Sequence, residues 1–343
     1  MRGEAVYYCG NRSLRIEAVT VQPPGPDEVQ ISVGFCGICG TDLLIYRGRM
    51  DERVGKRRII GHEMSGRIAA LGERVEGMAV GAPVVVRPLA PCGQCHPCRT
   101  GKNRLCHSLK VFGVDLEGSM QQLWNVPARA VHRLPDGLAL AHAALVEPLA
   151  VAVRDVRRAR VAPGEDVLVI GGGPIGLLVA LVARKAGGAV TVSEVNPHRA
   201  QLAEELGFRV INPRRANLAA EVAGATHGKG ADVVFEASGN QAGLDAMTEA
   251  AAVNGRICIV GMHLDSPRLD LHRVIMRELE IIGSRAYEAE DFERAIELLR
   301  EGIAAERIIT EMRRLGDVGE AFRDLCENPA SIKTLIVVNG AST

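Results

Sequence analysis

The sequence predicts an α/β protein in which a β-rich region is followed by a parallel sheet with helices on both faces. Residues 1 to about 135 contain short β-branched runs separated by Pro and Gly turns, among them LRIEAVTV, EVQISVGF, SGRIAALG and APVVVRP. From about residue 147 to 284, short apolar runs alternate with segments of helical periodicity. This alternation is typical of repeated β-α-β units.

The alternating region supplies the expected strands DVLVI, AVTVSE, FRVIN, DVVFEAS, RICIVG and LEIIGS, with helices such as LLVALVARKAG and PHRAQLAEELG between them. The last ~60 residues add a charged amphipathic helix, AEDFERAIELLREG, and a closing strand, TLIVV. No linker separates these regions, so the boundaries are placed where the pattern changes, which gives residues 1–146, 147–286 and 287–343.

The composition is that of an ordinary globular protein, with 47% hydrophobic and 24% charged residues in a chain of 343. The 41 basic and 41 acidic residues balance, so we expect no nucleic-acid partner and no attraction to an anionic membrane. No run approaches the ~18 apolar residues of a membrane helix, and the first residues lack a signal-peptide pattern. A cytoplasmic location is the expectation.

A glycine-rich turn, GGGPIG, lies between the strand VLVI and a helix and satisfies the G-x-G-x-x-G pattern. Gly171 permits the tight turn, Gly173 lets the backbone approach a pyrophosphate, and Gly176 lets the helix pack closely on the strand. The helix N-terminus that follows offers free N–H groups to the phosphates. The pattern predicts a dinucleotide site that includes Pro174 and Ile175, and a tight turn without a nucleotide is the alternative.

An acidic residue indicates which dinucleotide binds. Glu194 ends the second strand, about 20 residues beyond the glycines, where a carboxylate binds ribose hydroxyls and repels a 2′-phosphate. This favours NAD over NADP, although Arg199 could soften the preference. Val260, Met262 and Ser284 end later strands, where ligands bind in open α/β sheets, and are candidate cofactor contacts.

Four of the nine cysteines lie within fifteen residues, in the loop PCGQCHPCRTGKNRLC. Cys92, Cys95, Cys98 and Cys106 offer four thiolates, the set that a closed tetrahedral zinc site requires. The loop is rich in Gly, Pro and polar residues, so bound zinc would fix its fold. The prediction is a structural zinc site, with redox-active or incidental cysteines as the alternative.

A second, reactive metal would need ligands outside this loop. The candidates are Cys39 in FCGICGTD, the pair His62 and Glu63 in IIGHEMSG, and Glu147 in EPLAVAV. Taken alone, each is weak, because a His-Glu pair is commonly a surface feature and such a cysteine is commonly a small core residue. Their spacing does not decide the question, since they are far apart in the sequence.

The motifs CGICGTD, GHE, the four-cysteine loop, EPLAVAV and GGGPIG, in this order, resemble the zinc-dependent medium-chain alcohol dehydrogenase superfamily over essentially the whole chain. The sequence is most similar to the polyol branch, which includes sorbitol, threonine and butanediol dehydrogenases. The resemblance implies a Rossmann NAD-binding domain and a GroES-like catalytic domain, which the chain returns to complete. It also implies a homo-oligomer, a tetramer or otherwise a dimer.

The resemblance assigns roles to the site residues. Asp42 would orient His62 through a hydrogen bond, and Thr41 would relay the proton from the substrate. Zinc would activate a secondary hydroxyl of a small polyol, sugar alcohol or diol, and NAD would accept the hydride to give a ketone. The implied ligands of the catalytic zinc are Cys39, His62, Glu63 and Glu147, the last directly or through water.

Several features leave the substrate open. Leu44 stands where many relatives have a histidine in the proton relay, so the proton must leave through water, Glu147 or another residue. Arg285, with Tyr287 nearby, lies in a segment that resembles the sorbitol dehydrogenase region which meets both nicotinamide and substrate, so it is a candidate cofactor contact. Its guanidinium also suits a multiply hydroxylated or anionic substrate, although an arginine that caps a strand end is an equal alternative. The segment CGTDLLIYRG resembles the threonine enzymes, which makes L-threonine 3-dehydrogenase the second hypothesis.

Two further classes of protein compete with these. A zinc-free quinone reductase of the same fold does not need the cysteines and the His-Glu pair, and a non-catalytic nucleotide-binding protein would leave the complete ligand set unexplained. The remaining histidines, His263 among them, carry no motif and are expected to be surface or packing residues.

Overall fold

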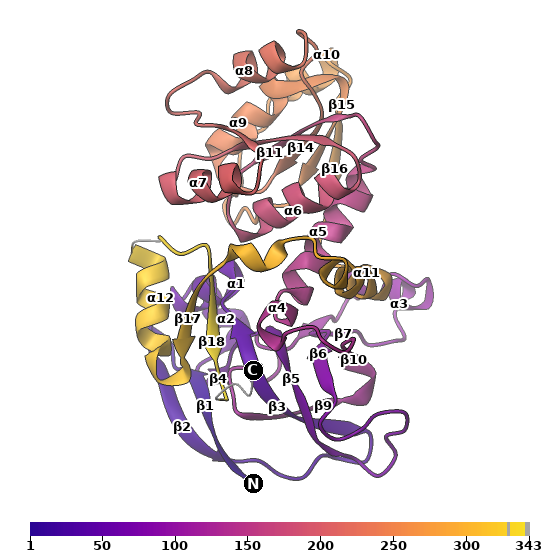
Figure 1. Cartoon of the computed structure of the whole chain (residues 1–343), viewed down its shortest axis with the longest axis vertical. Helices are drawn as coiled ribbons and strands as arrows, with labels where there is room; N and C mark the ends of the chain where they lie inside the picture. The colour runs from indigo at the N-terminus through magenta and orange to yellow at the C-terminus, as the bar shows by residue number, and fades with distance from the viewer. Residues whose placement is uncertain (328–329, 340–343) are drawn as a thin grey trace. The chain divides into compact units, whose positions relative to one another are not determined.

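The computed structural model describes residues 1–327 and 330–339, and the chain forms two compact units (Figure 1). Unit 1 contains Met1–Glu147, Ala295–Gly302 and the segment from Ile309 onward, and unit 2 contains Pro148–Arg294 and Ile303–Ile308. The chain thus leaves unit 1 after Glu147 and returns to it later. In the described ranges, no helix is both long enough and apolar enough to cross a membrane.

Unit 2 is built on one parallel sheet of six strands in the order β13-β12-β11-β14-β15-β16. The strand order reverses between β11 and β14, and in such sheets ligands bind beyond the carboxyl ends of the strands at that point. The predicted parallel sheet is confirmed. The strands are β11 (Asp166–Ile170), β12 (Ala189–Ser193), β13 (Arg209–Ile211), β14 (Ala231–Glu236), β15 (Ala251–Ile259) and β16 (Glu280–Gly283).

Helices connect these strands. Several begin at an Asn or Asp whose side chain accepts a backbone N–H of the first turn, as Asn196, Asn217, Asn240 and Asp270 do. Buried side chains such as Leu168, Val234 and Met247 pack between the layers. The helices are α5 (Val146–Ala159), α6 (Pro174–Lys185), α7 (Pro197–Glu205), α8 (Leu218–Ala225), α9 (Gln241–Ala250), α10 (Leu271–Met276), α11 (Ala289–Arg300) and the 3₁₀ turn η3 (Ala305–Ile308).

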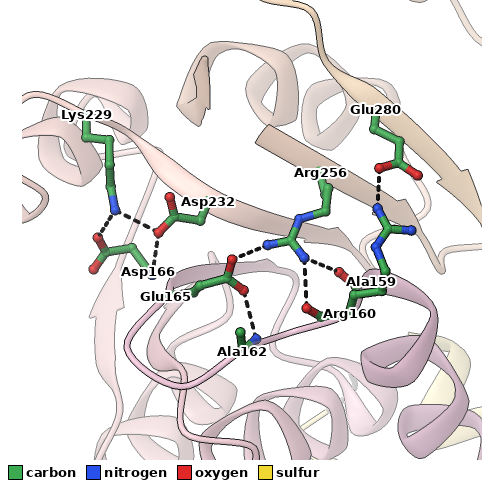
Figure 2. A network of polar contacts seen from close by, with 9 residues as sticks. All are labelled: Ala159, Arg160, Ala162, Glu165, Asp166, Lys229, Asp232, Arg256 and Glu280. Atoms are coloured by element: carbon green, nitrogen blue, oxygen red, sulfur yellow. Dashed lines mark hydrogen bonds and ion pairs between the residues drawn. The ribbon is translucent and has the colours of Figure 1, made fainter. Parts of the chain in front are cut away.

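Polar contacts tie strands of this sheet to the end of α5 (Figure 2). The Arg256 guanidinium donates to the carbonyl oxygens of Ala159 and Arg160, both at 2.8 Å, and pairs with the Glu165 carboxylate. It thereby satisfies carbonyls that the last helical turn leaves unpaired. Lys229 joins Asp166, at the start of β11, to Asp232 on β14.

Arg256→Met is expected to lower the free energy of unfolding by about 1.5–3 kcal/mol, because the Arg256 side chain is only 16% exposed and its bonds involve charged groups. Lys229→Met is the matched control: that side chain is 46% exposed, so about 0–1 kcal/mol is expected. Urea unfolding followed by circular dichroism measures both. Equal losses in the two variants would contradict the role assigned to Arg256.

Unit 1 contains a mainly antiparallel sheet in the order β10-β6-β5-β3-β18-β17, with β9 also paired to β3, and a smaller sheet, β2-β1-β4. The late strand β18 pairs with β3, with Leu335 opposite Gly37 and Ile336 opposite Cys36. Tyr8, Ile31 and Trp124 are among the core residues. The strands are β1 (Arg2–Tyr8), β2 (Leu14–Thr20), β3 (Glu28–Gly37), β4 (Arg58–Ile59), β5 (Glu63–Leu71), β6 (Pro83–Val86), β9 (Leu123–Pro127), β10 (Val131–Arg133), β17 (Ile309–Arg314) and β18 (Lys333–Val337).

The helices of unit 1 are short, apart from the C-terminal one. Tyr46 on α1 packs against Phe322 on α12, with ring centroids 5.4 Å apart, so the returning chain closes the core on this side. The helices are α1 (Gly40–Tyr46), α2 (Asp51–Val54), α4 (Leu140–Ala143), α12 (Val318–Glu327) and the 3₁₀ turns η2 (Ala128–Ala130) and η4 (Leu315–Asp317).

Candidate functional site

Three potential metal ligands meet in unit 1. A sulfur of Cys39, a ring nitrogen of His62 and a carboxylate oxygen of Glu63 all lie within 4.8 Å of one another. Cys39 caps α1: its Sγ accepts the Thr41 N–H at 3.5 Å, and the Asp42 carboxylate accepts the Cys39 N–H at 2.9 Å. This turn directly follows β3, whose last residue pairs with Glu63 at the start of β5. The local fold therefore places the thiol beside the His-Glu pair.

Asp42 is fully buried, and its Oδ1 lies 3.7 Å from His62 Nδ1. Neither atom has a hydrogen-bond partner among the described residues, and 3.7 Å is an ion-pair distance rather than a hydrogen bond. Burial acts to lower the pKa of His62, but the charges of Asp42, Cys39 and Glu147 outweigh it and raise that pKa well above its usual value. A half-buried thiol together with a buried imidazole and a buried carboxylate fits Zn²⁺.

Lys333, which the sequence did not indicate, is part of the same cluster. Its side chain is 2% exposed, forms an ion pair with Glu63 and donates to the carbonyl oxygen of Ile38 at 2.9 Å. Burial opposes the charge on Lys333, yet Glu63, Cys39 and Asp42 hold its pKa above the usual value. A Cβ at Gly37 would lie 3.0 Å from the Lys333 side chain and would collide with Glu63, so a larger residue there would displace the ion pair.

The other predicted residues of this site lie on α1 and at the start of α5. Glu147, half-buried near the start of α5, is not one of the group within 4.8 Å, although its charge contributes to the raised pKa of His62. Thr41 and Leu44 are half-buried on α1, immediately after Cys39. A ligand role for Glu147 therefore stays a prediction, whereas Thr41 is held next to the thiol by the cap itself.

The four-cysteine loop also forms one cluster. The sulfurs of Cys92, Cys95, Cys98 and Cys106 all lie within 4.8 Å of one another. Backbone N–H groups point at sulfur, as Cys92 N does at Cys106 Sγ at 3.2 Å, and the amides of Gln94 and Cys95 lower the pKa of Cys92 to about 6. These donors favour the thiolate form of Cys92, the form that binds zinc, whereas burial and the Cys95 thiol raise the pKa of Cys98 to about 12. The loop contains α3 (His96–Arg99) and η1 (Asn103–Leu105) and is closed by β7 (Leu89–Ala90) and β8 (Lys110–Val111).

In unit 2, the glycine turn joins β11 to α6. Gly171 has φ +102, and a Cβ there would approach Ser238 within 3.0 Å, while a Cβ at Gly176 would collide with the carbonyl oxygen of Gly171. By contrast, a Cβ at Gly173, the N-cap of α6, would meet only an Arg199 nitrogen at 3.6 Å. Space therefore remains in front of the helix N-terminus, which Pro174 and Ile175 begin.

Glu194 and Arg199 lie beside this turn. One Glu194 oxygen accepts the Gly172 N–H at 2.6 Å and the other accepts the amides of Val195 and Asn196, so the carboxylate, 6% exposed, is fixed in place. Arg199 on α7 has a buried Nε without a hydrogen-bond partner in the described part of the chain. An unpaired guanidinium N–H near the turn suits a phosphate.

The residues predicted at the ends of later strands vary in exposure. Met262 is 57% exposed, Val260 and Ser284 are half-buried, and Arg285 is exposed. Tyr287, in contrast, is 1% exposed and packs on Phe292, with ring centroids 5.5 Å apart, so it belongs to the core and not to a substrate site.

A turn for a dinucleotide in one unit and a Cys-His-Glu cluster in the other define the class of zinc-dependent dehydrogenases. Residues 25–136 match the family model "alcohol dehydrogenase GroES-like domain", and residues 174–301 match "zinc-binding dehydrogenase". The chain belongs to this family of zinc-binding alcohol dehydrogenases. It is an oxidoreductase of the polyol branch, with zinc and NAD as its cofactors.

Individual relatives match nearly the whole chain. 2-Dehydro-3-deoxy-L-galactonate 5-dehydrogenase from Pseudoalteromonas atlantica is 46% identical, with 98% of each chain covered. Sorbitol dehydrogenase from Bacillus subtilis is 32% identical over 91% of this chain and 90% of its own. The crystal structure of 2R,3R-butanediol dehydrogenase from Bacillus subtilis superposes with a TM-score of 0.90 at 30% identity, and it covers 98% of this chain and 100% of that one.

Proposed function

We propose that this protein oxidises a secondary hydroxyl of a small polyhydroxylated substrate to a ketone with NAD, and that the substrate is a sugar acid. The Cys39-His62-Glu63 group supports the reaction class, since it brings together a thiol, an imidazole and a carboxylate. The relative with 46% identity supports the substrate class, because it is named a 5-dehydrogenase of a sugar acid. Exposed Arg285 is our candidate for the substrate carboxylate.

The chain's own residues would prepare the reaction. Cys39, His62 and Glu63, with Glu147 directly or through water, would hold the catalytic zinc, which when bound makes a substrate hydroxyl more acidic. Thr41 would receive the hydroxyl proton and pass it toward the cofactor. Asp42 would keep the His62 ring in its orientation, and Lys333 would balance the charge of Glu63.

A substrate panel tests this proposal. NADH formation would be followed with 2-dehydro-3-deoxy-aldonates, aldonates, sugar alcohols, vicinal diols and L-threonine. We expect the highest kcat/KM with a sugar acid. A higher value with L-threonine would establish the second hypothesis, L-threonine 3-dehydrogenase, which rests on the segment CGTDLLIYRG. Zinc-loaded protein that binds NAD but turns over none of these would favour a non-catalytic nucleotide-binding protein.

Glu194 is expected to set the preference for NAD over NADP. Glu194→Gln keeps the size of the side chain but removes the charge that repels a 2′-phosphate. The ratio of kcat/KM for NAD to that for NADP should fall by about ten- to a hundredfold, as expected for the loss of hydrogen bonds to a charged group. Adding Arg199→Leu should cancel any gain with NADP. An unchanged ratio in Glu194→Gln would refute the assignment.

The dinucleotide would lie over Gly171, Gly173 and Gly176 and extend toward Val260, Met262 and Ser284 at the ends of later strands. We also propose that the protein acts in the cytoplasm as a homo-oligomer, a tetramer or otherwise a dimer. Light scattering of the purified protein measures the oligomeric state.

A further inference from the structure

Glu236 is a fully buried carboxylate at the carboxyl end of β14, outside the residues assigned above. Burying an isolated carboxylate costs free energy, so a buried carboxylate needs hydrogen-bond or ion-pair partners. Its Oε1 accepts the N–H of Ser238 at 2.9 Å and that of Gly239 at 3.1 Å, and it also accepts the Ser238 hydroxyl. Its Oε2 lies 2.9 Å from Nε2 of His263.

These partners belong to two different loops at the carboxyl edge of the sheet. Ser238 and Gly239 follow β14, and His263 belongs to the loop that follows β15. The Glu236 backbone adds to the link, because its carbonyl oxygen accepts the N–H groups of Val260 and Gly261, at 2.9 and 2.7 Å. One residue of β14 thus fixes both loops.

The linked loops pack closely at their glycines. A Cβ at Gly261 would lie 2.7 Å from Glu236 Oε2, and a Cβ at Gly239 would lie 3.2 Å from the carbonyl oxygen of Met262. The loop after β14 also touches the glycine turn, since a Cβ at Gly171 would meet the Ser238 backbone at 3.0 Å. The two loops and the glycine turn are therefore packed against one another.

We infer that Glu236 and His263 are positioning residues for the dinucleotide, which hold the loops after β14 and β15 in the shape that binds its nicotinamide half. The strands β14 to β16 form the second mononucleotide-binding half of the sheet, and β14 stands at the reversal of the strand order. Neither residue needs to touch the cofactor. The inference rests on the proposed placement of NAD at this edge.

His263→Leu tests the inference, with His263→Gln as the matched variant, because the Gln amide offers an N–H near the position of His Nε2. By titration calorimetry, His263→Leu should raise the Kd for NAD about tenfold, the loss expected for one hydrogen bond to a charged group, and His263→Gln should recover most of it. The KM for NAD should follow the Kd, whereas kcat, the KM for the alcohol and the zinc content should stay near the wild-type values. His272→Ala, at an exposed site on α10, is the control.

The outcomes separate this inference from the proposed function. If wild-type protein binds NAD and His263→Leu binds it within twofold, the positioning role is wrong and the cofactor site stands. Equal losses in His263→Leu and His263→Gln would also overturn it, since the hydrogen bond would then not matter. If wild-type protein does not bind NAD, both the inference and the proposed function fail.

Discussion

Cys39→Ser is expected to lower kcat/KM by about a thousandfold or more, because loss of the thiolate removes several kcal/mol of transition-state stabilisation that depends on the metal. The zinc content should fall by one ion per chain, since the sulfur clusters with His62 and Glu63 and not with the four-cysteine loop. NAD binding should be unchanged, because the glycine turn belongs to the other unit. Metal analysis, calorimetry and initial rates measure the three quantities.

Cys36 supplies the control for this prediction. It lies three residues earlier on β3, is buried, and has its sulfur 3.2 Å from the Ser119 hydroxyl rather than in the ligand group. Cys36→Ala should therefore keep both the zinc content and most of the activity. Full activity of Cys39→Ser, or an equal loss of zinc in the two variants, would rule out the proposed centre.

Features made by neighbouring residues could be predicted from the sequence. The glycine turn acts through backbone geometry within six residues, and the structure gives it the expected strand, turn and helix. The four cysteines lie in one loop, Cys92–Cys106, whose ends are brought together by the pairing of β7 with β8. In both places, the residues that act together lie in one short segment, so the sequence pattern is enough to predict the site.

Contacts made by strand pairing could not be predicted in this way. Lys333 reaches Glu63 because β18 pairs with β3, and no local pattern marks a lysine in an apolar strand as an ion-pair partner. His263 was expected to be a surface or packing residue, but it pairs with Glu236, the last residue of β14. The two residues come together only because β14 and β15 pair in parallel. Cys39, His62 and Glu63 were assigned to one zinc site from the family resemblance, because their spacing in the sequence does not show that they are close in space.

Lys333→Met is expected to destabilise unit 1 by about 3–5 kcal/mol, because removing one partner of a buried ion pair leaves an uncompensated charge. Both side chains are nearly inaccessible, at 2% and 1% exposed, so water cannot replace the lost ammonium. The donor to the Ile38 carbonyl is lost as well, which loosens the residue immediately before Cys39. Urea unfolding of metal-free protein measures this loss of stability, because no bound zinc then neutralises the charge of Glu63.

The double variant Glu63→Gln with Lys333→Met shows whether the cost comes from charge. A neutral amide carries no buried charge, so the pair of substitutions should destabilise the protein by about 2 kcal/mol less than Lys333→Met alone. If the two costs simply add, Lys333 stabilises unit 1 by packing, and the ion pair with Glu63 contributes nothing. If they do not add, the same charge balance acts on a proposed zinc ligand: without the ammonium, Glu63 is left for the metal alone and a buried cation no longer repels it, so Lys333→Met should tighten zinc binding at Cys39, His62 and Glu63.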